Sequence, residues 1–393
     1  MLTQNDRDIN LLNCLVDLGA KKICSDNNLR AQELIRNEIE FRISGKYAYS
    51  QEEFSVKVCS SNQAKIYFNN NQCKAYLLDY TGAQGNSLKA ELVFLGSGTD
   101  RDFRNNNVRG KIVACRYGLA NHRILQVERA KKYQAAGVVI ISGHRDLLQI
   151  GTGHPEFKET SVIPALSITK NDWACLSKYI GKQIRLEYQQ KISSGKGNNL
   201  IFDLLQNESK ECIVIGTHFD SWSGGAQDNS IGVVMLIALA EQIVKRGFKK
   251  NIRLIFFDAE EVGMVGSRWH VEHNDSKNYI AYINLDMPVP CKNTNMRAIL
   301  FSKEPHIRKS VSFVQLLGNW FLPVSLNLFY RISNALFPSD IDSFYQKGIP
   351  CITTYCSNIY YHTSQDTVDK INLKTYPVVL SMIERIIRKL EGS

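Results

Sequence analysis

The sequence lacks the long apolar segments that mark membrane-spanning and secreted proteins. No apolar run approaches the roughly 20 residues that a transmembrane helix needs. The N-terminus at residues 1–6 lacks a basic segment followed by an apolar run. No secretory signal is therefore visible. We expect a cytoplasmic protein if the chain is full length, and a secreted one if it is a processed form.

A disulfide or zinc-finger framework is also missing. The ten cysteines include no Cys-x-x-Cys pair, and most have apolar neighbours, as Cys115 has in Val113-Ala114. This pattern favours buried free thiols in a reducing compartment. The even number of cysteines leaves disulfides open if the chain is a processed form.

Charge of one sign is not concentrated anywhere along the chain. The formal net charge is +10, but the Lys and Arg residues are scattered. Lys245-Arg246 and Lys249-Lys250 flank a predicted helix end, where cations suit the helix dipole. A solvated surface is favoured over a nucleic-acid partner. With 44% hydrophobic and 22% charged residues, the 393-residue chain is long enough for two globular domains.

The first 87 residues contain predicted helices and strands without candidate chemistry. Apolar residues recur at helical spacing within 8–42, whereas 47–80 alternates in the manner of strands. We expect residues 1–87 to pack on a catalytic domain.

Residues 88–190 form a separate predicted unit of strands and helices. A Gly-Lys-Ile-Val turn at 110–113, an Ala-Ala-Gly-Val-Val-Ile-Ile run at 135–141 and an Ile-Pro-Ala strand at 163–165 follow one another. Their order resembles a protease-associated (PA) domain, the non-catalytic insert of several peptidases. The polar, Gly-rich stretch Ser193–Asn198 is typical of a linker that returns to the main domain.

Residues 191–393 alternate between strands and helices. Strands are predicted at 212–216, 252–257, 279–284 and 351–355, and helices at 233–244 and 376–390. The alternation indicates an α/β fold with a mixed, mostly parallel sheet flanked by helices. No internal repeat is evident.

Candidate metal ligands gather at the ends of these predicted strands. In open α/β sheets, ligands bind outside the carboxyl ends of the strands. A lone His is usually structural and paired Glu at a helix start are usually caps, but a set of four at matching strand ends is hard to explain by chance. Two His and several carboxylates suit a pair of zinc ions, so a metal-dependent hydrolase is the first hypothesis. The four residues at strand ends are His218, Glu260, Glu261 and Asp286; the other candidates are Asp220 beside His218, Asp228 in a loop and His362 far downstream.

These residues lie in an ordered set of motifs that resembles a known family. The motifs are Thr217–Asp220, Gly225–Ser230, Asp258–Gly263, Asn284–Met287 and Tyr361–Thr363. They resemble those of the co-catalytic zinc peptidases, which include aminopeptidase Y, the bacterial leucyl aminopeptidases and glutamate carboxypeptidase. The resemblance covers about 191–393 and the inserted domain, and it implies two zinc ions per chain.

The resemblance also implies a role for each residue. Asp228 would bridge the two zinc ions; His218 and Asp286 would complete one site, and Glu261 and His362 the other. Each site keeps an open position for water, as catalytic zinc requires.

Two further carboxylates have implied roles beside the zinc ligands. Asp220 would accept the second ring N–H of His218 and so fix its tautomer. Glu260 would act as general base on the metal-bridged water and would then protonate the leaving amine.

The activity implied is that of an exopeptidase, most often an aminopeptidase, acting on a peptide or peptide-like substrate. A glutamate-carboxypeptidase-like or amidase activity stays open, with Arg297, Lys303 and Arg308 as candidates to grip a substrate carboxylate. Glutaminyl cyclase chemistry fits poorly, because that branch uses one zinc. A non-catalytic receptor fits least, because all five ligands are present. The sequence does not give the oligomeric state, the natural substrate or the side-chain preference.

Three smaller features lie beside the main motifs. Ser339–Phe344 resembles the family's Ser-Asp-x-x-Pro-Phe segment, with Ser343 in place of Pro, and we expect Asp340 in a pocket wall. His270 and His273 have i,i+3 spacing that could mimic a metal pair, but a surface helix is favoured. Aromatic residues near the late motifs fit either a substrate pocket or the core; they are Phe329, Tyr330, Phe337, Phe344, Tyr360 and Tyr361.

Overall fold

The computed structural model describes residues 4–81, 86–118, 123–143, 163–204, 209–292, 296–299, 339–356 and 358–392. The chain forms two compact units. The first contains Met1–Val56, Lys196–Tyr361 and Asp366–Ser393, and the second contains Lys57–Gly195 and His362–Gln365.

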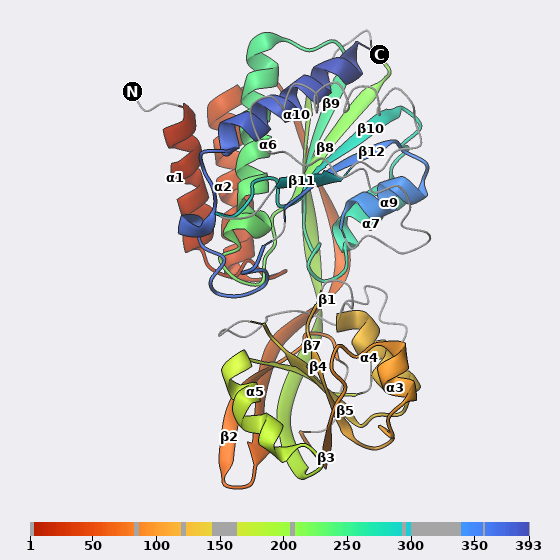
Figure 1. Ribbon diagram of the computed structural model, residues 1–393. Coiled ribbons are helices and arrows are strands. Elements are labelled where there is room, and N and C mark those ends of the chain that lie inside the picture. The colour runs from red at the N-terminus through yellow and green to blue at the C-terminus, as the bar shows by residue number, and fades with distance from the viewer. Residues whose placement is uncertain are drawn as a thin grey trace. The chain divides into compact units, whose positions relative to one another are not determined.

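A mixed sheet forms the centre of the first unit (Figure 1). Strands β9, β8, β10 and β12 run parallel, whereas β7 and β11 are antiparallel to their neighbours. The predicted α/β fold is confirmed, and the carboxyl ends of β8, β9 and β10 meet at one edge. The spatial order is β7 (Gln183–Leu204), β9 (Asn251–Phe257), β8 (Cys212–His218), β10 (Tyr279–Leu285), β12 (Cys351–Cys356) and β11 (Met296–Ile299).

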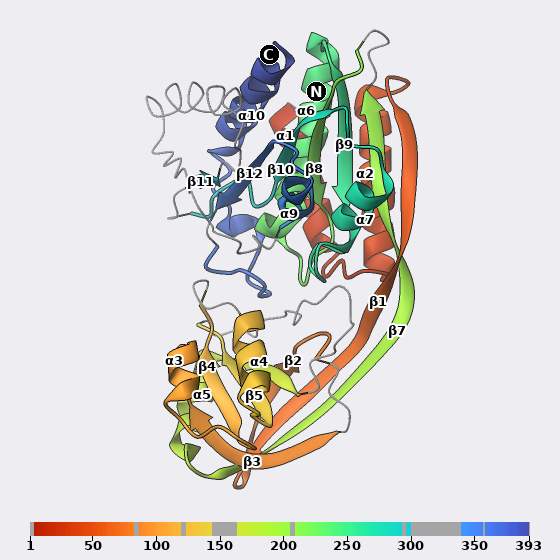
Figure 2. The same cartoon turned by 90° about the vertical axis from the view of Figure 1, so that its right-hand side faces the viewer.

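Helices cover both faces of this sheet (Figures 1 and 2). One face carries α1 (Gln4–Asp17), α2 (Asp26–Ile43), α6 (Ile231–Arg246) and α10 (Tyr376–Glu391), and the other carries α7 (Val265–His273) and α9 (Ile341–Gln346). Most of α6 is buried, because α1, α2 and α10 pack around it. An apolar surface on all sides is what such a central helix requires.

A buried ion pair ties the helices of the first face together. The guanidinium of Arg42 on α2 lies 2.5 Å from Asp8 on α1 and 3.5 Å from Glu241 on α6. The hydroxyl of Tyr376 on α10 donates a 2.9 Å hydrogen bond to Asp8. Because an unpaired buried charge is costly, these contacts favour one arrangement of the four helices.

The second unit has its own sheet and two small cores. β1 (Ala48–Phe68), β2 (Asn71–Leu77), β6 (Ala165–Ile168), β5 (Gly137–Ile141), β4 (Ile112–Arg116), β3 (Ser87–Phe94) and the first part of β7 follow one another in the sheet. Apolar residues of the two faces pack with the helices into separate clusters. The helices are α3 (Asp100–Arg104), α4 (Arg123–Lys132) and α5 (Lys170–Leu176); short 3₁₀ turns are η2 (Ser177–Tyr179) here and η4 (Val368–Lys370) in the first unit.

The chain returns from the second unit to the first between Gly195 and Lys196, inside the segment expected to be the return linker. The segment is not a loop, however, because Ser193–Asn198 lies inside the continuous strand β7, which pairs with β1. Gly197 is buried there, and a Cβ atom on it would lie 2.5 Å from the ring of Phe54 and 2.8 Å from Ile23. The glycine therefore serves close packing rather than chain flexibility.

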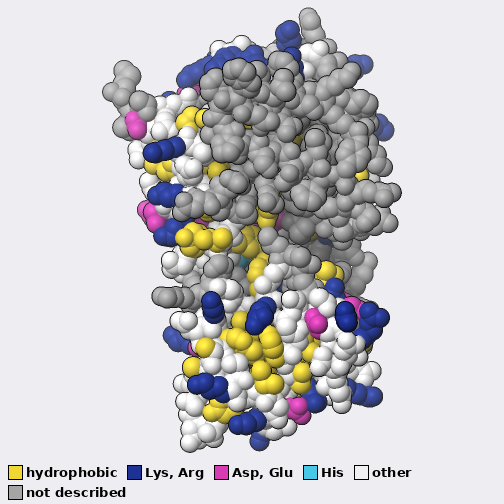
Figure 3. Space-filling model, in the orientation of Figure 1, with side chains coloured by type: hydrophobic (Ala, Val, Ile, Leu, Met, Phe, Trp, Pro, Cys, Tyr) yellow, Lys and Arg dark blue, Asp and Glu magenta, His cyan; other side chains and the backbone are white. Residues whose placement is uncertain are grey.

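Three further observations concern the surface charge, the helices and the thiols. Lys and Arg side chains are spread over the coloured part of the surface in Figure 3 and do not gather into one patch. Within the described ranges, the helices are either too short or too polar to cross a membrane. All ten cysteines lie in those ranges, and none of them forms a disulfide.

We expect Gly197→Val to lower the free energy of unfolding by about 1–3 kcal/mol, the usual cost of forcing extra volume into a packed core. Gly143→Val is the control, because no atom of the described residues lies within 4 Å of a Cβ atom there, and it should change stability by less than about 0.5 kcal/mol. Urea unfolding of both variants measures the difference. Equal stability of the two variants would mean that the strand tolerates a side chain at 197.

Candidate metal centre

The strand ends bring the predicted acidic and histidine residues to one edge of the sheet. His218 is the last residue of β8, Asp258 follows β9, and Asp286 follows β10. All three are buried. Because the three strands are parallel, their carboxyl ends present these side chains side by side.

Three of the predicted ligands form a first buried group. Ligand atoms of His218, Asp228 and Asp286 lie within 4.8 Å of one another. The Nε2 atom of His218 is 3.3 Å from an oxygen of Asp228 and 3.8 Å from an oxygen of Asp286. Zinc binds nitrogen and oxygen at about 2.0–2.2 Å, so ligand atoms at these separations can share one ion.

A second group shares one carboxylate with the first. Ligand atoms of Asp228, Glu261 and His362 also lie within 4.8 Å of one another, and all three residues are buried. Asp228 thus belongs to both groups. This donor set of nitrogen and carboxylate oxygen fits zinc, and the shared carboxylate is what two neighbouring cations need.

The charge balance of the metal-free site favours a cation beside His218. Burial lowers the pKa of His218, but the charge of Glu260 and hydrogen bonds with Asp220, Asp228 and Asp286 outweigh it, so the pKa lies well above its usual range. The surrounding carboxylates thus stabilise positive charge at this point, which a metal ion would provide in place of the proton.

Asp366 holds the loop that carries Asp228. Its carboxylate accepts hydrogen bonds from the backbone N–H groups of Gln227 and Asp228, both at 3.1 Å. Burial raises the pKa of Asp366 to about 6, although these N–H groups lower it. Asp366 was not predicted from the sequence. The feature that could have indicated it is its position four residues after the candidate ligand His362.

Asn229 joins the same loop to two strand ends. Its amide donates to Thr217 at 2.9 Å and to the carbonyl of Leu285 at 2.8 Å. A Cβ atom on Gly232 would lie 2.4 Å from Asn229 and 2.6 Å from Thr217. The start of α6 therefore approaches β8 so closely that only glycine fits at 232.

The segment before α9 supports Asp286. The hydroxyl of Ser339 donates a 2.6 Å hydrogen bond to the carboxylate of Asp286, and Thr354 accepts the Asp286 N–H at 3.1 Å. The neighbouring Asp340 is buried, and burial raises its pKa to about 7, while the charge of His218 lowers it. Asp340 is therefore a buried acid whose charge interacts with those of His218, Asp220 and Asp286.

Asp220 positions the turn that carries the paired glutamates. Its two carboxylate oxygens accept the N–H groups of Glu260 and Glu261, each at 3.1 Å. Ala259, just before them, has a left-handed backbone with φ 62°, a conformation that costs energy in a non-glycine residue. The second ring nitrogen of His218 lies 3.2 Å from the backbone carbonyl of Asp220 and 3.6 Å from its carboxylate.

Glu260 differs from its neighbour Glu261 in exposure. Glu261 is buried, whereas Glu260 is partly exposed. Burial of its carboxyl group raises the pKa of Glu260 well above the usual range; the charges of Asp340, Glu261 and Asp286 add to this, and His218 opposes it. A raised pKa makes a carboxylate a stronger base, which is what a group that accepts a proton from water needs.

Several candidates lie away from these groups. The expected surface position of His270 is wrong, because it is buried between Glu52 at 2.8 Å and the hydroxyl of Tyr279 at 3.1 Å. His273 is exposed. Phe344 belongs to the core, with its ring centroid 3.8 Å from that of Tyr282. The side chains of Phe329, Tyr330, Phe337, Arg297, Lys303 and Arg308 lie outside the described residues.

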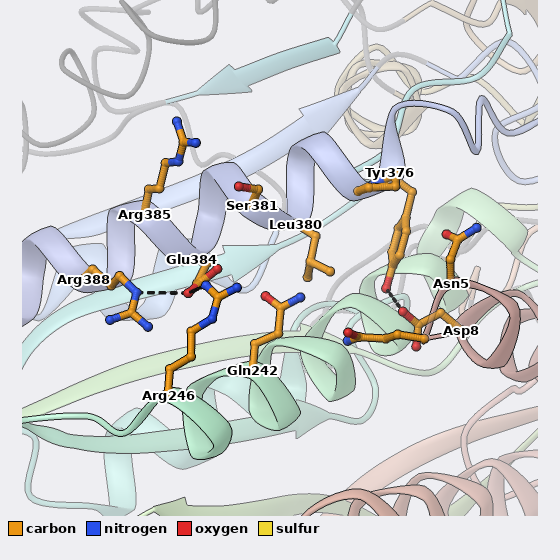
Figure 4. A pocket seen from close by; sticks show the side chains of 12 residues that line it. Asn5, Asp8, Gln242, Arg246, Tyr376, Leu380, Ser381, Glu384, Arg385 and Arg388 are labelled. Carbon is orange, nitrogen blue, oxygen red and sulfur yellow. Dashed lines mark hydrogen bonds and ion pairs between the residues drawn. The ribbon is translucent and has the colours of Figure 1, made fainter. Parts of the chain in front are cut away.

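A cavity of about 550 Å³ lies elsewhere in the first unit, between α1, α6 and α10 (Figure 4). Its charged lining is largely paired internally: Glu384 contacts Arg246 and Arg388. None of the predicted ligands lines it. Two of its lining residues, Gln242 and Arg246, lie on α6. They are about 20 Å along the helix axis from the N-terminus of α6, which follows the loop with Asp228.

Comparison with known proteins agrees with these observations. Residues 199–387 match the model of peptidase family M28, and residues 66–176 match the model of the PA domain. Residues 199–387 are thus similar to the M28 peptidases. This finding confirms the resemblance drawn from the ordered motifs.

The M28 peptidase domain has aminopeptidases and carboxypeptidases among its relatives. The chain is 30% identical over 209 residues to aminopeptidase YwaD of Bacillus subtilis, covering 51% of this chain and 44% of the relative. It is 27% identical over 203 residues to a probable glutamate carboxypeptidase of Arabidopsis thaliana, covering 47% of this chain and 28% of the relative. The chain thus spans half or less of the length of these curated relatives.

The fold of the M28 and PA domains also has a solved counterpart. A zinc aminopeptidase from Bacillus subtilis matches 98% of this chain and 94% of its own, with a TM-score of 0.77 and 18% identity. At this level of identity the likeness concerns the fold.

We expect Asp220→Asn to weaken zinc binding or the rate of hydrolysis by about 10–100-fold without unfolding the chain. An amide can accept at its oxygen only, so one of the two N–H groups of Glu260 and Glu261 would lose its acceptor. Zinc titration and circular dichroism measure the two effects. Asp275→Asn, at an exposed position, is the control; a wild-type result for Asp220→Asn would leave Asp220 without a part in the site.

Proposed function

We propose that this protein is a two-zinc aminopeptidase that removes N-terminal residues from peptides. The observation that carries the proposal is Asp228, which belongs to both buried ligand groups. The M28 match and the aminopeptidases among the relatives support the same activity.

The ligand groups would hold the two ions in adjacent sites. His218 and Asp286 would bind one zinc, Glu261 and His362 the other, and Asp228 both. When bound, zinc would supply a Lewis acid that polarises the scissile carbonyl and makes water more acidic.

Glu260 would carry the proton during hydrolysis. The residue is less buried than Glu261, and its backbone N–H is fixed by Asp220. Its raised pKa suits a group that takes a proton from the attacking water and then gives it to the leaving amine. The adjacent Glu261 is turned into the buried ligand group, so the two glutamates serve different purposes.

The acidic surroundings favour a substrate with a free α-amine. Glu260 and Asp340 interact through their charges, and neither is a proposed zinc ligand, so an ammonium group near them would gain favourable electrostatic interactions. A substrate carboxylate at the same place would be repelled. For this reason we place N-terminal cleavage ahead of glutamate-carboxypeptidase-like cleavage.

We expect Glu260→Gln to keep two zinc ions per chain and to lose about 10²–10⁴-fold in kcat. The amide is nearly isosteric with the carboxyl group but cannot transfer the proton. Metal analysis by mass spectrometry, together with steady-state kinetics, tests both parts. Exposed Glu272→Gln is the matched control, and near-normal kcat in metal-replete Glu260→Gln would rule out the assigned role.

We expect acetylation of the substrate's N-terminus to abolish cleavage, because the acidic groups then lose their cationic partner. Dipeptides with an apolar or aromatic first residue should be cleaved best when the amine is free. Product formation from matched free and N-acetylated dipeptides is the measurement. Faster cleavage of the acetylated form with its free C-terminal carboxylate would contradict the aminopeptidase proposal and favour a carboxypeptidase.

A further inference from the structure

A buried lysine reaches the metal centre from a part of the chain that neither family match includes. The matches cover residues 66–176 and 199–387, and Lys21 lies before both. It is 1% exposed. Its backbone bridges to Ser221, with N–O distances of 3.1 and 3.4 Å in the two directions.

The ammonium group of Lys21 is held by the backbone of the ligand loop. Nζ donates to the carbonyl of Gly224 at 2.8 Å and to that of Leu15 at 3.4 Å. Gly224 lies four residues before Asp228, in a loop also fixed at Ser230, whose hydroxyl donates to the same carbonyl at 3.3 Å. Lys21 is therefore built into the support of the shared ligand.

Four carboxylates act on this buried charge. Burial lowers the pKa of Lys21 to about 8, while the charges of Asp366, Asp220, Glu261 and Asp228 raise it. Its hydrogen-bond acceptors are neutral carbonyls, so the charge is not matched to a single acid but is shared among the cluster. At neutral pH, Lys21 is mainly an ammonium ion, held on the ligand loop and influenced by the charges of these acids.

We propose that Lys21 is a positioning residue of the metal centre, an internal counter-ion that keeps the carboxylate cluster assembled before zinc binds. This inference rests on the proposed two-zinc site. Buried carboxylates repel one another strongly in a medium of low dielectric constant. In the metal-free chain, Lys21 offsets part of that repulsion; with zinc bound, the ions offset it and the ammonium repels them.

The consequence is a stability effect that depends on metal. Removal of the charge should destabilise the metal-free chain more than the zinc-loaded chain. By linkage, zinc should then bind the folded variant more tightly than it binds the wild type. A lysine that only supplied hydrogen bonds to Gly224 and Leu15 would instead cost the same stability in both states.

The experiment compares wild type, Lys21→Met, Lys21→Gln and the control Lys277→Met, whose native side chain is 87% exposed. Each full chain is dialysed against a chelator at pH 7, and thermal unfolding is recorded without metal and with saturating zinc. Zinc affinity is measured by competition with a chromophoric chelator. Lys21→Gln keeps a hydrogen-bond donor without the charge, so it separates the two contributions.

We expect zinc to raise the Tm of both Lys21 variants more than that of wild type and control, and to bind them about tenfold more tightly, as the loss of one like-charge repulsion predicts. Equal Tm losses with and without zinc, or wild-type behaviour of Lys21→Gln, would overturn the inference. Failure of both variants to fold even with zinc would also overturn it, because the ions should compensate. If the wild type binds no zinc, the proposed function fails instead, and the zinc-induced shift is absent from all four proteins.

Discussion

The main constraint on this structure is the repulsion among buried carboxylates at one edge of a parallel sheet. Asp220, Asp228, Asp258, Glu261 and Asp286 are all buried there. Burial, with a further contribution from the charge of Asp220, raises the pKa of Asp258 to about 8. Acids in such a position need partners, because an unpaired buried charge is expensive.

Asp220, Asp258 and Asp286, together with the nearby Asp366, have partners contributed by other segments of the chain. Asn28 on α2 donates to Asp258 at 2.9 Å, Ser339 donates to Asp286, and backbone N–H groups bind Asp220 and Asp366. These contacts fix loops as well as charges, since the same groups determine where the ligand atoms lie. The precision of a metal site depends on such supporting bonds.

The sequence predicted most of the sheet, and the structure brings the five predicted ligands together in two groups; the roles assigned to the seven site residues stay predictions. Apolar runs marked the strands, and short motifs at their ends marked the acids and histidines. The supporting residues were harder to find, since Lys21, Asn28 and Asp366 look like surface residues in sequence and gain their meaning only from contacts more than 100 residues away.

Two errors have similar physical causes. His270 was assigned to a surface helix, yet Glu52 and Tyr279 enclose it in the fold. Ser193–Asn198 has the composition of a loop, but pairing with β1 makes it part of a strand. In both cases long-range pairing outweighed local composition.

The first unit is discontinuous in sequence, and this affects how the chain is made. Arg42 meets its partner Glu241 199 residues later, and Asp8 meets Tyr376 368 residues later. During synthesis, α1 and α2 therefore leave the ribosome long before α6 and α10 exist to cover them. Residues 57–195 are complete by then, so the second unit can close its own sheet while the apolar faces of α1 and α2 still lack their partners. Those two helices are the part of the nascent chain with the longest need for protection from aggregation.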